Sequence, residues 1–200
     1  MTSKIIIALS LLFINSLDAA HTNKTENILS FKISFHHFNL GYLKAIQLVS
    51  DNTNTFSIHG KAEGDLFFKK IVSENNIYSV FEKGELISSN ALFIRNGKTL
   101  SNTRTTLQKG AYVVSTIEKK NQLVNHSIYF TVGRMYFQEP KDVEFIYSEA
   151  WGKDLQLSRK NNTYSFTIPD GTVCIFKYQN GILQEMISKT MIGDIKFTKI

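Results

Sequence analysis

Apolar and polar residues alternate along most of the chain. In the run from Leu29 to Phe35, every second residue is apolar and the residues between are Ser30, Lys32 and Ser34. A period of two places these sets on opposite faces of a β-strand. Similar runs of about 8 to 12 residues follow, separated by Gly, Asn and Asp. The pattern predicts an antiparallel β protein with one apolar and one polar face.

Short polar segments predict where the strands turn. Asn96-Gly97 is the strongest hairpin signal, because both residue types tolerate the positive φ of a type I′ turn. Glu82 to Glu85 and Gln108 to Gly110 predict two further turns, and Asn39-Leu40-Gly41 predicts a turn before a strand at 42–49. The stretch 65–81 fits one long bulged strand or two shorter strands. Later strands are expected at 144–151, 153–158, 163–168, 172–178, 182–188 and 192–198.

Residues 125–137 break the alternation. Apolar residues recur there at helical spacing, Ser127 is a suitable N-cap, and Pro140 prevents a long continuation. The spacing predicts one short helix near 127–137. We therefore expect an all-β fold, a strongly curved antiparallel sheet or half-barrel of about a dozen strands, with the helix covering an open mouth or edge.

The first twenty residues have the composition of a secretory signal peptide. Lys4 precedes an apolar stretch at 5–14, and small residues follow, so cleavage is expected after Ala19 or Ala20. The predicted organisation is a signal peptide at 1–20, a polar lead at 21–28 and a single β domain at 29–200. No later apolar run is long enough to span a membrane as a helix, so a periplasmic or secreted protein without a transmembrane segment is expected.

Composition agrees with one globular core. The 200 residues are 42% hydrophobic and include 15 Phe and a single cysteine, Cys174, which lies in an apolar strand-like run and is expected to be buried. The aromatic residues either fill a closed core or line a cavity for an apolar molecule, and the sequence leaves both possibilities open.

No pattern of catalytic or metal-binding residues is present in the sequence. His36 and His37 are neighbours in a predicted strand and would point to opposite faces, and the best remaining cluster, His59 with Glu63 and Asp65, fits a polar strand end. The nucleophile elbow of hydrolases is missing. Carboxyl pairs such as Glu139 with Glu149 are commoner as turn or surface groups. We predict no catalytic residue, no metal, no cofactor and no enzyme activity.

The formal charge of +6 raises nucleic acid and anionic membrane surfaces as partners. The basic pairs Lys69-Lys70, Lys119-Lys120 and Arg159-Lys160 are spread along the chain at predicted strand ends, where lysine protects sheet edges. Together with the export signal, this distribution argues against a nucleic-acid partner and leaves weak attraction to acidic head groups open.

One turn motif occurs twice. Phe81-Glu-Lys-Gly-Glu-Leu86 and Tyr178-Gln-Asn-Gly-Ile-Leu183 share an aromatic residue, two polar residues, Gly, a variable residue and Leu. Both are expected to be hairpins in which the aromatic residue packs on the leucine across the strands.

Several motifs carry a resemblance to a known family. Tyr136-Phe-Gln-Glu-Pro140, Tyr147-Ser-Glu-Ala-Trp-Gly152, Pro169-Asp-Gly171 and the second turn motif resemble a family of secreted bacterial proteins known as a domain of unknown function. That family in turn resembles periplasmic half-barrel lipid carriers such as LolA and LolB, where a curved sheet holds lipid chains under a helical lid. The resemblance implies a fold and supplies no catalytic residues.

These observations favour an exported, non-enzymatic β protein that binds an apolar or amphiphilic, lipid-like ligand. The alternative is an envelope scaffold or interaction protein with a filled core, whose partner is another envelope protein. A ligand site is expected under the predicted helix, at Ile128, Val132, Met135, Tyr136 and Trp151.

Overall fold

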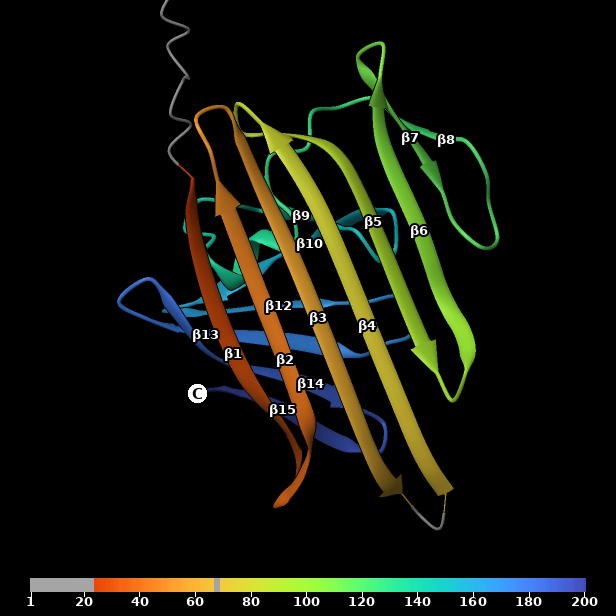
Figure 1. Cartoon of the computed structure of the whole chain (residues 1–200), viewed down its shortest axis with the longest axis vertical. Helices are drawn as coiled ribbons and strands as arrows, with labels where there is room; N and C mark the ends of the chain where they lie inside the picture. The colour runs from red at the N-terminus through yellow and green to blue at the C-terminus, as the bar shows by residue number, and fades with distance from the viewer. Residues whose placement is uncertain (1–23, 67–68) are drawn as a thin grey trace, which may run out of the picture.

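The backbone forms one long, curved antiparallel sheet. The computed structural model describes residues 24–66 and 69–200. The thirteen strands of the main sheet have the order β11-β12-β13-β14-β15-β1-β2-β3-β4-β5-β6-β7-β8, and β9 and β10 form a separate two-stranded sheet. In Figure 1, β1 to β6 form the front layer and β12 to β15 cross behind them. The two layers are continuous through the pairing of β1 with β15.

The strands have the following bounds: β1 Thr25–Phe35, β2 Phe38–Val49, β3 Thr53–Leu66, β4 Lys69–Glu82, β5 Glu85–Arg95, β6 Lys98–Gln108, β7 Ala111–Ser115, β8 Gln122–Val124, β9 Phe145–Ser148, β10 Lys153–Gln156, β11 Ser158–Lys160, β12 Thr163–Thr167, β13 Val173–Gln179, β14 Ile182–Thr190 and β15 Gly193–Lys199. The predicted all-β class with a curved sheet is confirmed. The edge strands β8 and β11 were not predicted, because three residues are too few to show a period.

The alternation of apolar and polar residues places the apolar side chains on the inner face of the sheet, where they form the core. In β1, Phe31, Ile33 and Phe35 are buried while Lys32 is exposed. Inward-facing residues from both layers join one cluster, which includes Leu43, Phe56, Ile58, Phe81, Tyr164 and Phe176. Edge-to-face aromatic pairs such as Phe56 with Phe81, whose ring centroids are 5.5 Å apart, contribute to this packing.

The N-terminal predictions are only partly within the described residues. The signal peptide expected at 1–20 lies outside them. Strand β1 begins at Thr25, inside the stretch that was expected to be a polar lead. Among the described residues, no helix has the length and apolarity that a membrane span requires.

Most turn predictions are confirmed by backbone geometry. Asn96 and Gly97 have φ values of 49° and 76°, as a type I′ hairpin requires. The repeated motif also forms two equivalent hairpins, with Phe81 paired to Leu86 and Tyr178 paired to Leu183. These four side chains are buried, so the motif packs an aromatic ring on a leucine at two places in the core.

The first hairpin differs from its prediction. The turn lies at His36 and His37, so these residues are not in a strand, and Asn39 to Gly41 belong to β2. Gly41 has a φ of 148°, and a Cβ at this position would lie 2.1 Å from the carbonyl oxygen of Lys61. The glycine therefore serves a close approach of β2 to β3 and does not form the turn.

The ambiguous stretch at 65–81 divides between two strands. Residues 65 and 66 end β3, and β4 runs unbroken from Lys69 to Glu82. Their register continues from Thr53 opposite Glu82 to Leu66 opposite Lys69 without a shift.

The helix predicted near 127–137 is reduced to a single 3₁₀ turn, η1, at Arg134–Tyr136. The residues before it are held in an extended conformation, because the amide of Tyr147 donates to the carbonyl of Phe130 and the amide of Val132 donates to the carbonyl of Tyr147. Apolar residues recur at helical spacing here because this extended segment is buried on more than one side, not because it forms a helix.

Replacing Gly41 with alanine tests the close approach of β2 and β3. The added Cβ would meet the Lys61 carbonyl, so Gly41→Ala is expected to lower the free energy of unfolding by about 3 kcal/mol in chemical denaturation. Gly97→Ala is the matched control, since Gly97 has positive φ but open space around its Cα, and should cost only about 1 kcal/mol. Equal losses in the two variants would contradict the assigned close approach.

Candidate ligand-binding site

The residues predicted to form a site lie on a segment inside the fold. We call residues 128–157 the internal segment; it contains η1, β9 and β10, lies behind the front strands in Figure 1, and contributes buried residues to the core cluster. Ile128, Met135 and Tyr136 are buried in the main core, Val132 is partly buried, and Trp151 is 37% exposed at a turn. One side of the segment is buried against the sheet, and the other side exposes residues such as Tyr129 and Phe145.

Aromatic contacts connect η1 to both layers. The ring of Tyr136 lies 5.8 Å from that of Phe31 in β1 and 6.1 Å from that of Phe176 in β13. The hydroxyl of Tyr178 donates to the carbonyl of Met135. The space under the predicted helix is therefore occupied by side chains of the internal segment and the sheet.

A row of buried hydroxyl groups on the sheet forms hydrogen bonds with the part of the internal segment around β9. Ser79, Ser89 and Thr105 are consecutive cross-strand partners in β4, β5 and β6, and we call them the hydroxyl row. Ser79 donates to Oε1 of Glu149 at 3.0 Å, and Thr105 shares a hydrogen bond of 2.7 Å with the hydroxyl of Tyr147. Because polar groups dock the segment here, its position along the sheet is specified by hydrogen bonds as well as by apolar burial.

Two more hydroxyl groups of β6 fix the turn after β9. Ser101 and Thr103 both donate to the carbonyl of Ala150, at 2.7 and 2.8 Å. Gly152 follows with positive φ, and a Cβ there would lie 2.6 Å from a methyl group of Val114. The motif Tyr147 to Gly152, noticed in the sequence, is thus the part of the internal segment that binds β4 to β7.

Glu149 is an unusual group in this interface. It is fully buried, its Oε1 also accepts from the amide of Gly133 at 3.1 Å, and its Oε2 has no hydrogen-bond partner among the described residues. Burial raises the pKa of Glu149, and the nearby hydroxyl of Thr131, the amide of Gly133 and the hydroxyl of Ser79 oppose that rise only in part. Its sequence neighbours give no sign of this burial.

Burial also keeps a tyrosine hydroxyl and a thiol of the interior protonated. Burial raises the pKa of Tyr112 to about 12, and the Tyr112 hydroxyl donates to the carbonyl of Leu86 and accepts from the amide of Ile128. Burial also raises the pKa of Cys174 to about 11, so the thiol stays protonated near neutrality. Glu139, considered with Glu149 as an acid pair, instead accepts from the hydroxyl of Tyr164.

A second candidate site lies on the outer face of β1 to β3. A hollow of about 560 Å³, the outer-face hollow, is lined by Ser30, Gly41, Tyr42, Leu43, Lys44, His59, Lys61, Glu63 and Ile200, and Glu63 is paired with Lys70. Tyr42 is 56% exposed, and its direct cross-strand partners are Lys32 and Lys61. The outer-face hollow therefore combines apolar surface with ammonium groups around one aromatic ring.

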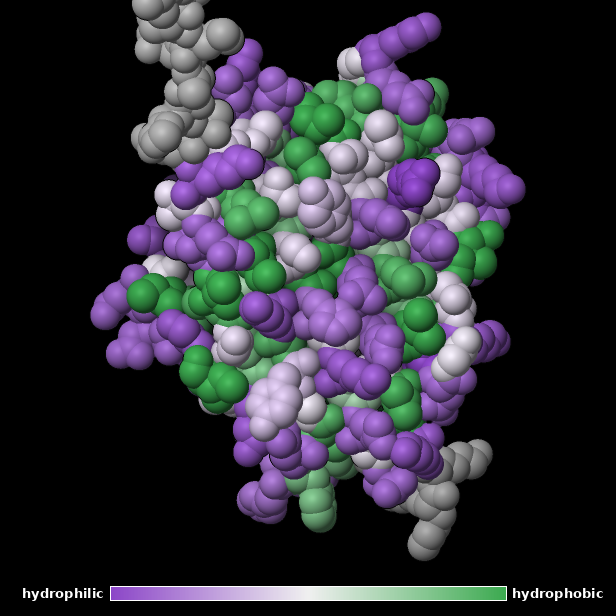
Figure 2. All heavy atoms as spheres, in the orientation of Figure 1, coloured by the Kyte–Doolittle hydropathy of each residue, from purple (hydrophilic) through white to green (hydrophobic). Residues whose placement is uncertain are grey.

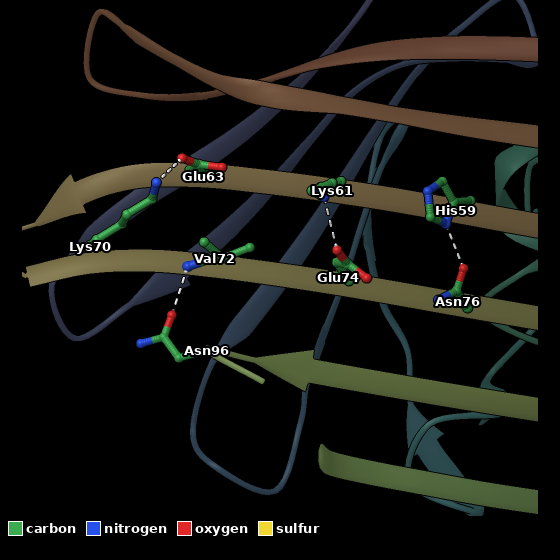
Figure 3. A network of polar contacts seen from close by, with 8 residues as sticks. All are labelled: His59, Lys61, Glu63, Lys70, Val72, Glu74, Asn76 and Asn96. Atoms are coloured by element: carbon green, nitrogen blue, oxygen red, sulfur yellow. Dashed lines mark hydrogen bonds and ion pairs between the residues drawn. The ribbon is translucent and has the colours of Figure 1, made fainter. Parts of the chain in front are cut away.

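Ion pairs neutralise some of the charged groups around the outer-face hollow. Lys61 lies 3.1 Å from Glu74, and Lys70 pairs with Glu63; both pairs join β3 to β4 (Figure 3). His59 and Asn76 form a hydrogen bond between the same two strands. The hydrogen bond from Lys70 lowers the pKa of Glu63. No carboxylate of the described residues pairs with Lys32 or Lys44.

Figure 2 views the outer face of β1 to β6 and shows hydrophobic residues distributed among hydrophilic ones. The outer-face residues Tyr42, Lys44 and Lys61 were missed by sequence reasoning. Their only signal in the sequence is that each occupies an outward-facing position of an alternating strand, and composition does not tell which strands pair.

In residues 24–66 and 69–200, no group of three or more His, Cys, Asp and Glu side chains is arranged to hold a metal ion.

The curved sheet and its internal segment define a β-barrel-like, all-β protein. The family model described as Domain of unknown function (DUF6134) matches residues 31–200, so the chain belongs to that family. A crystal structure of the beta-barrel-like protein of domain of unknown function DUF1849 from Brucella abortus has a TM-score of 0.51 and 11% identity, covering 88% of this chain and 94% of that chain. This likeness concerns the fold alone. No curated protein matches the chain.

Removing one hydroxyl tests the docking of the internal segment. Tyr147→Phe leaves the buried Thr105 without its partner, so we expect the free energy of unfolding to fall by about 1–2 kcal/mol. Tyr129→Phe is the control, since Tyr129 is 59% exposed, and should change stability little. Equal stability of the Tyr147 variant and the wild type in urea denaturation would argue against this hydrogen bond.

Proposed function

We propose that the protein is an exported, non-enzymatic β protein that binds an amphiphile with an anionic head group in its outer-face hollow. The observation that carries the proposal is the combination of Tyr42, Lys44 and Lys61 around apolar surface in a hollow of about 560 Å³. That volume is within the range of small-molecule sites. The expected likeness of its family to half-barrel lipid carriers such as LolA and LolB is the reason for choosing a lipid-like ligand.

The chemistry of the outer-face hollow favours a particular kind of amphiphile. An acyl chain would contact the Tyr42 ring and Ile200, and the head group would approach Lys44 and Lys61. Because Lys44 has no carboxylate partner among the described residues, an anionic phosphate or carboxylate would supply the missing countercharge. Such binding should weaken as salt concentration rises.

The inside of the sheet is a less suitable ligand site. The internal segment occupies the position that a lipid chain would take, with Met135 and Tyr136 buried between the layers. A ligand bound there would have to displace these contacts, which an outer-face ligand leaves intact.

Titration with a short-chain phospholipid tests the outer-face hollow. We expect dihexanoyl-phosphatidylglycerol, kept below its micelle concentration, to bind in calorimetry, and the choline analogue to bind more weakly. Tyr42→Ala and Lys44→Glu should each weaken binding about tenfold, because each removes about 1.4 kcal/mol of contact or charge.

Matched controls separate this site from general attraction to the surface. Tyr78→Ala and Lys98→Glu replace exposed residues of the same types that do not line the hollow, and should leave binding unchanged. Equal binding by the Tyr42 and Lys44 variants and the wild type would overturn the assignment. Vesicles of phosphatidylglycerol, used as a second probe, show whether the same site takes a bilayer head group.

A second candidate function rests on a different observation. Besides Tyr42, the outer face exposes Ile28, Leu48 and Tyr78, whose exposed fractions are 48%, 45% and 50%. Apolar residues on such a face favour an envelope interaction or scaffold protein with a filled core. Absence of phospholipid binding by the wild type would favour this alternative.

Export is tested by the mature N-terminus. The precursor produced in a bacterium with a periplasm should yield a periplasmic protein that begins at Ala20 or His21. Leu11→Arg interrupts the apolar stretch and should keep the precursor in the cytoplasm. N-terminal sequencing distinguishes these results, and retention of residues 1–20 on the wild-type protein would contradict export with cleavage.

A further inference from the structure

The interior contains one carboxyl group whose environment is unsuited to a charge. Glu149 is completely buried where the internal segment meets β4. Its Oε1 accepts from Ser79 and Gly133, while its Oε2 has no partner within the described part of the chain. An ionised carboxylate in such a place carries a large desolvation cost, whereas the protonated acid needs only one further acceptor for its proton.

The groups packed around Glu149 supply no countercharge. At Gly133, a Cβ would lie 2.8 Å from Oε1 of Glu149 and 3.2 Å from a methyl group of Ile58, so β3 approaches the carboxyl with an aliphatic side chain. Strand β4 contributes Ser79 and Ile77, neither of which titrates. The side chain of the buried Thr131 also lies at the carboxyl and carries no charge.

The charged and titratable neighbours also keep the site neutral. Tyr136 from η1 and Tyr147 from β9 face Glu149, and burial raises the pKa of both hydroxyl groups. The guanidinium of Arg134 is directed elsewhere, since it donates to the carbonyl oxygens of Gly84 and Tyr129. Among the groups that face Glu149 in the described chain, none is a cation.

We propose that Glu149 is a proton-controlled latch: the protonated side chain keeps the internal segment docked on the hydroxyl row, and loss of its proton to solvent releases the segment. The position of Glu149 makes this coupling direct, because the flanking Tyr147 and Ala150 provide the other hydrogen bonds to β6. Release would uncover the apolar inner face of the sheet. The inference is independent of the outer-face ligand.

The direction of the pH effect follows from linkage. The folded-state pKa of Glu149 is raised above its unfolded value, so its protonated form is favoured by folding. The docked state is therefore fully stable below the unfolded pKa and loses stability as pH rises through the folded pKa. The transition should occur at a pH above 4.5, the ordinary value for glutamate.

The single tryptophan reports on this transition. Trp151 lies two residues after Glu149 in the turn of the internal segment, and the chain has one Trp. We expect the emission of the mature protein to shift to longer wavelength between about pH 5 and about pH 9, the range that buried glutamates reach. The far-UV circular dichroism of the sheet should persist, and the dye ANS should bind as the inner face is uncovered.

Three variants separate the latch from general unfolding. Glu149→Gln imitates the protonated acid and should abolish the shift, whereas Glu144→Gln, an exposed carboxyl of the same segment, should keep it. Ser79→Ala removes one of the hydrogen bonds that dock Glu149, so it should move the midpoint of release to lower pH, and it provides a test if Glu149→Gln fails to fold.

A shift that persists in Glu149→Gln, or a wild-type protein without a shift over this range, would overturn the proposal. A Ser79→Ala midpoint that is unchanged or higher would also overturn it. Phospholipid binding at the outer-face hollow is measured separately, so failure of one proposal does not decide the other.

Discussion

A strongly curved sheet has an apolar inner face that must be covered, and the structure depends on how this chain covers it. The internal segment at 128–157 packs between the layers and satisfies buried polar groups of β4 to β6. Apolar burial alone would permit several positions of the segment. The hydrogen bonds of Tyr147, Glu149 and Ala150 select one of them, because each displaced partner would leave a buried polar atom unsatisfied.

Because the internal segment covers the inner face of the sheet, a ligand can reach only the outer face without displacing core contacts. The aromatic residues that would line a hollow barrel instead contact η1, as Phe31 and Phe176 do with Tyr136. The outer face therefore carries the accessible chemistry, with Lys44 and Tyr42 beside apolar surface. The anionic ligand that we propose would therefore bind at this face and leave the core closed.

Local signals in the sequence predicted the fold well. The turn at Asn96-Gly97 depends on two residues, so its chemistry is readable directly. The helix near 127–137 failed as a prediction because apolar residues at helical spacing also describe an extended segment buried between two layers. The candidate site was harder to predict. Tyr42 and Lys61 are neighbours only through strand register, and Glu149 is a buried carboxyl that its neighbours in sequence do not reveal.

If the internal segment fills the inner side of the sheet, the amphiphile that we propose as ligand must bind on the outer face. Nuclear magnetic resonance with a spin-labelled anionic phospholipid can locate the ligand, since the label broadens amide signals near the bound molecule. We expect broadening at Tyr42, Lys44 and Lys61 and sharp signals at Met135 and Tyr147. Broadening at Met135 and Tyr147 instead would place the ligand inside the sheet and rule out the outer-face site.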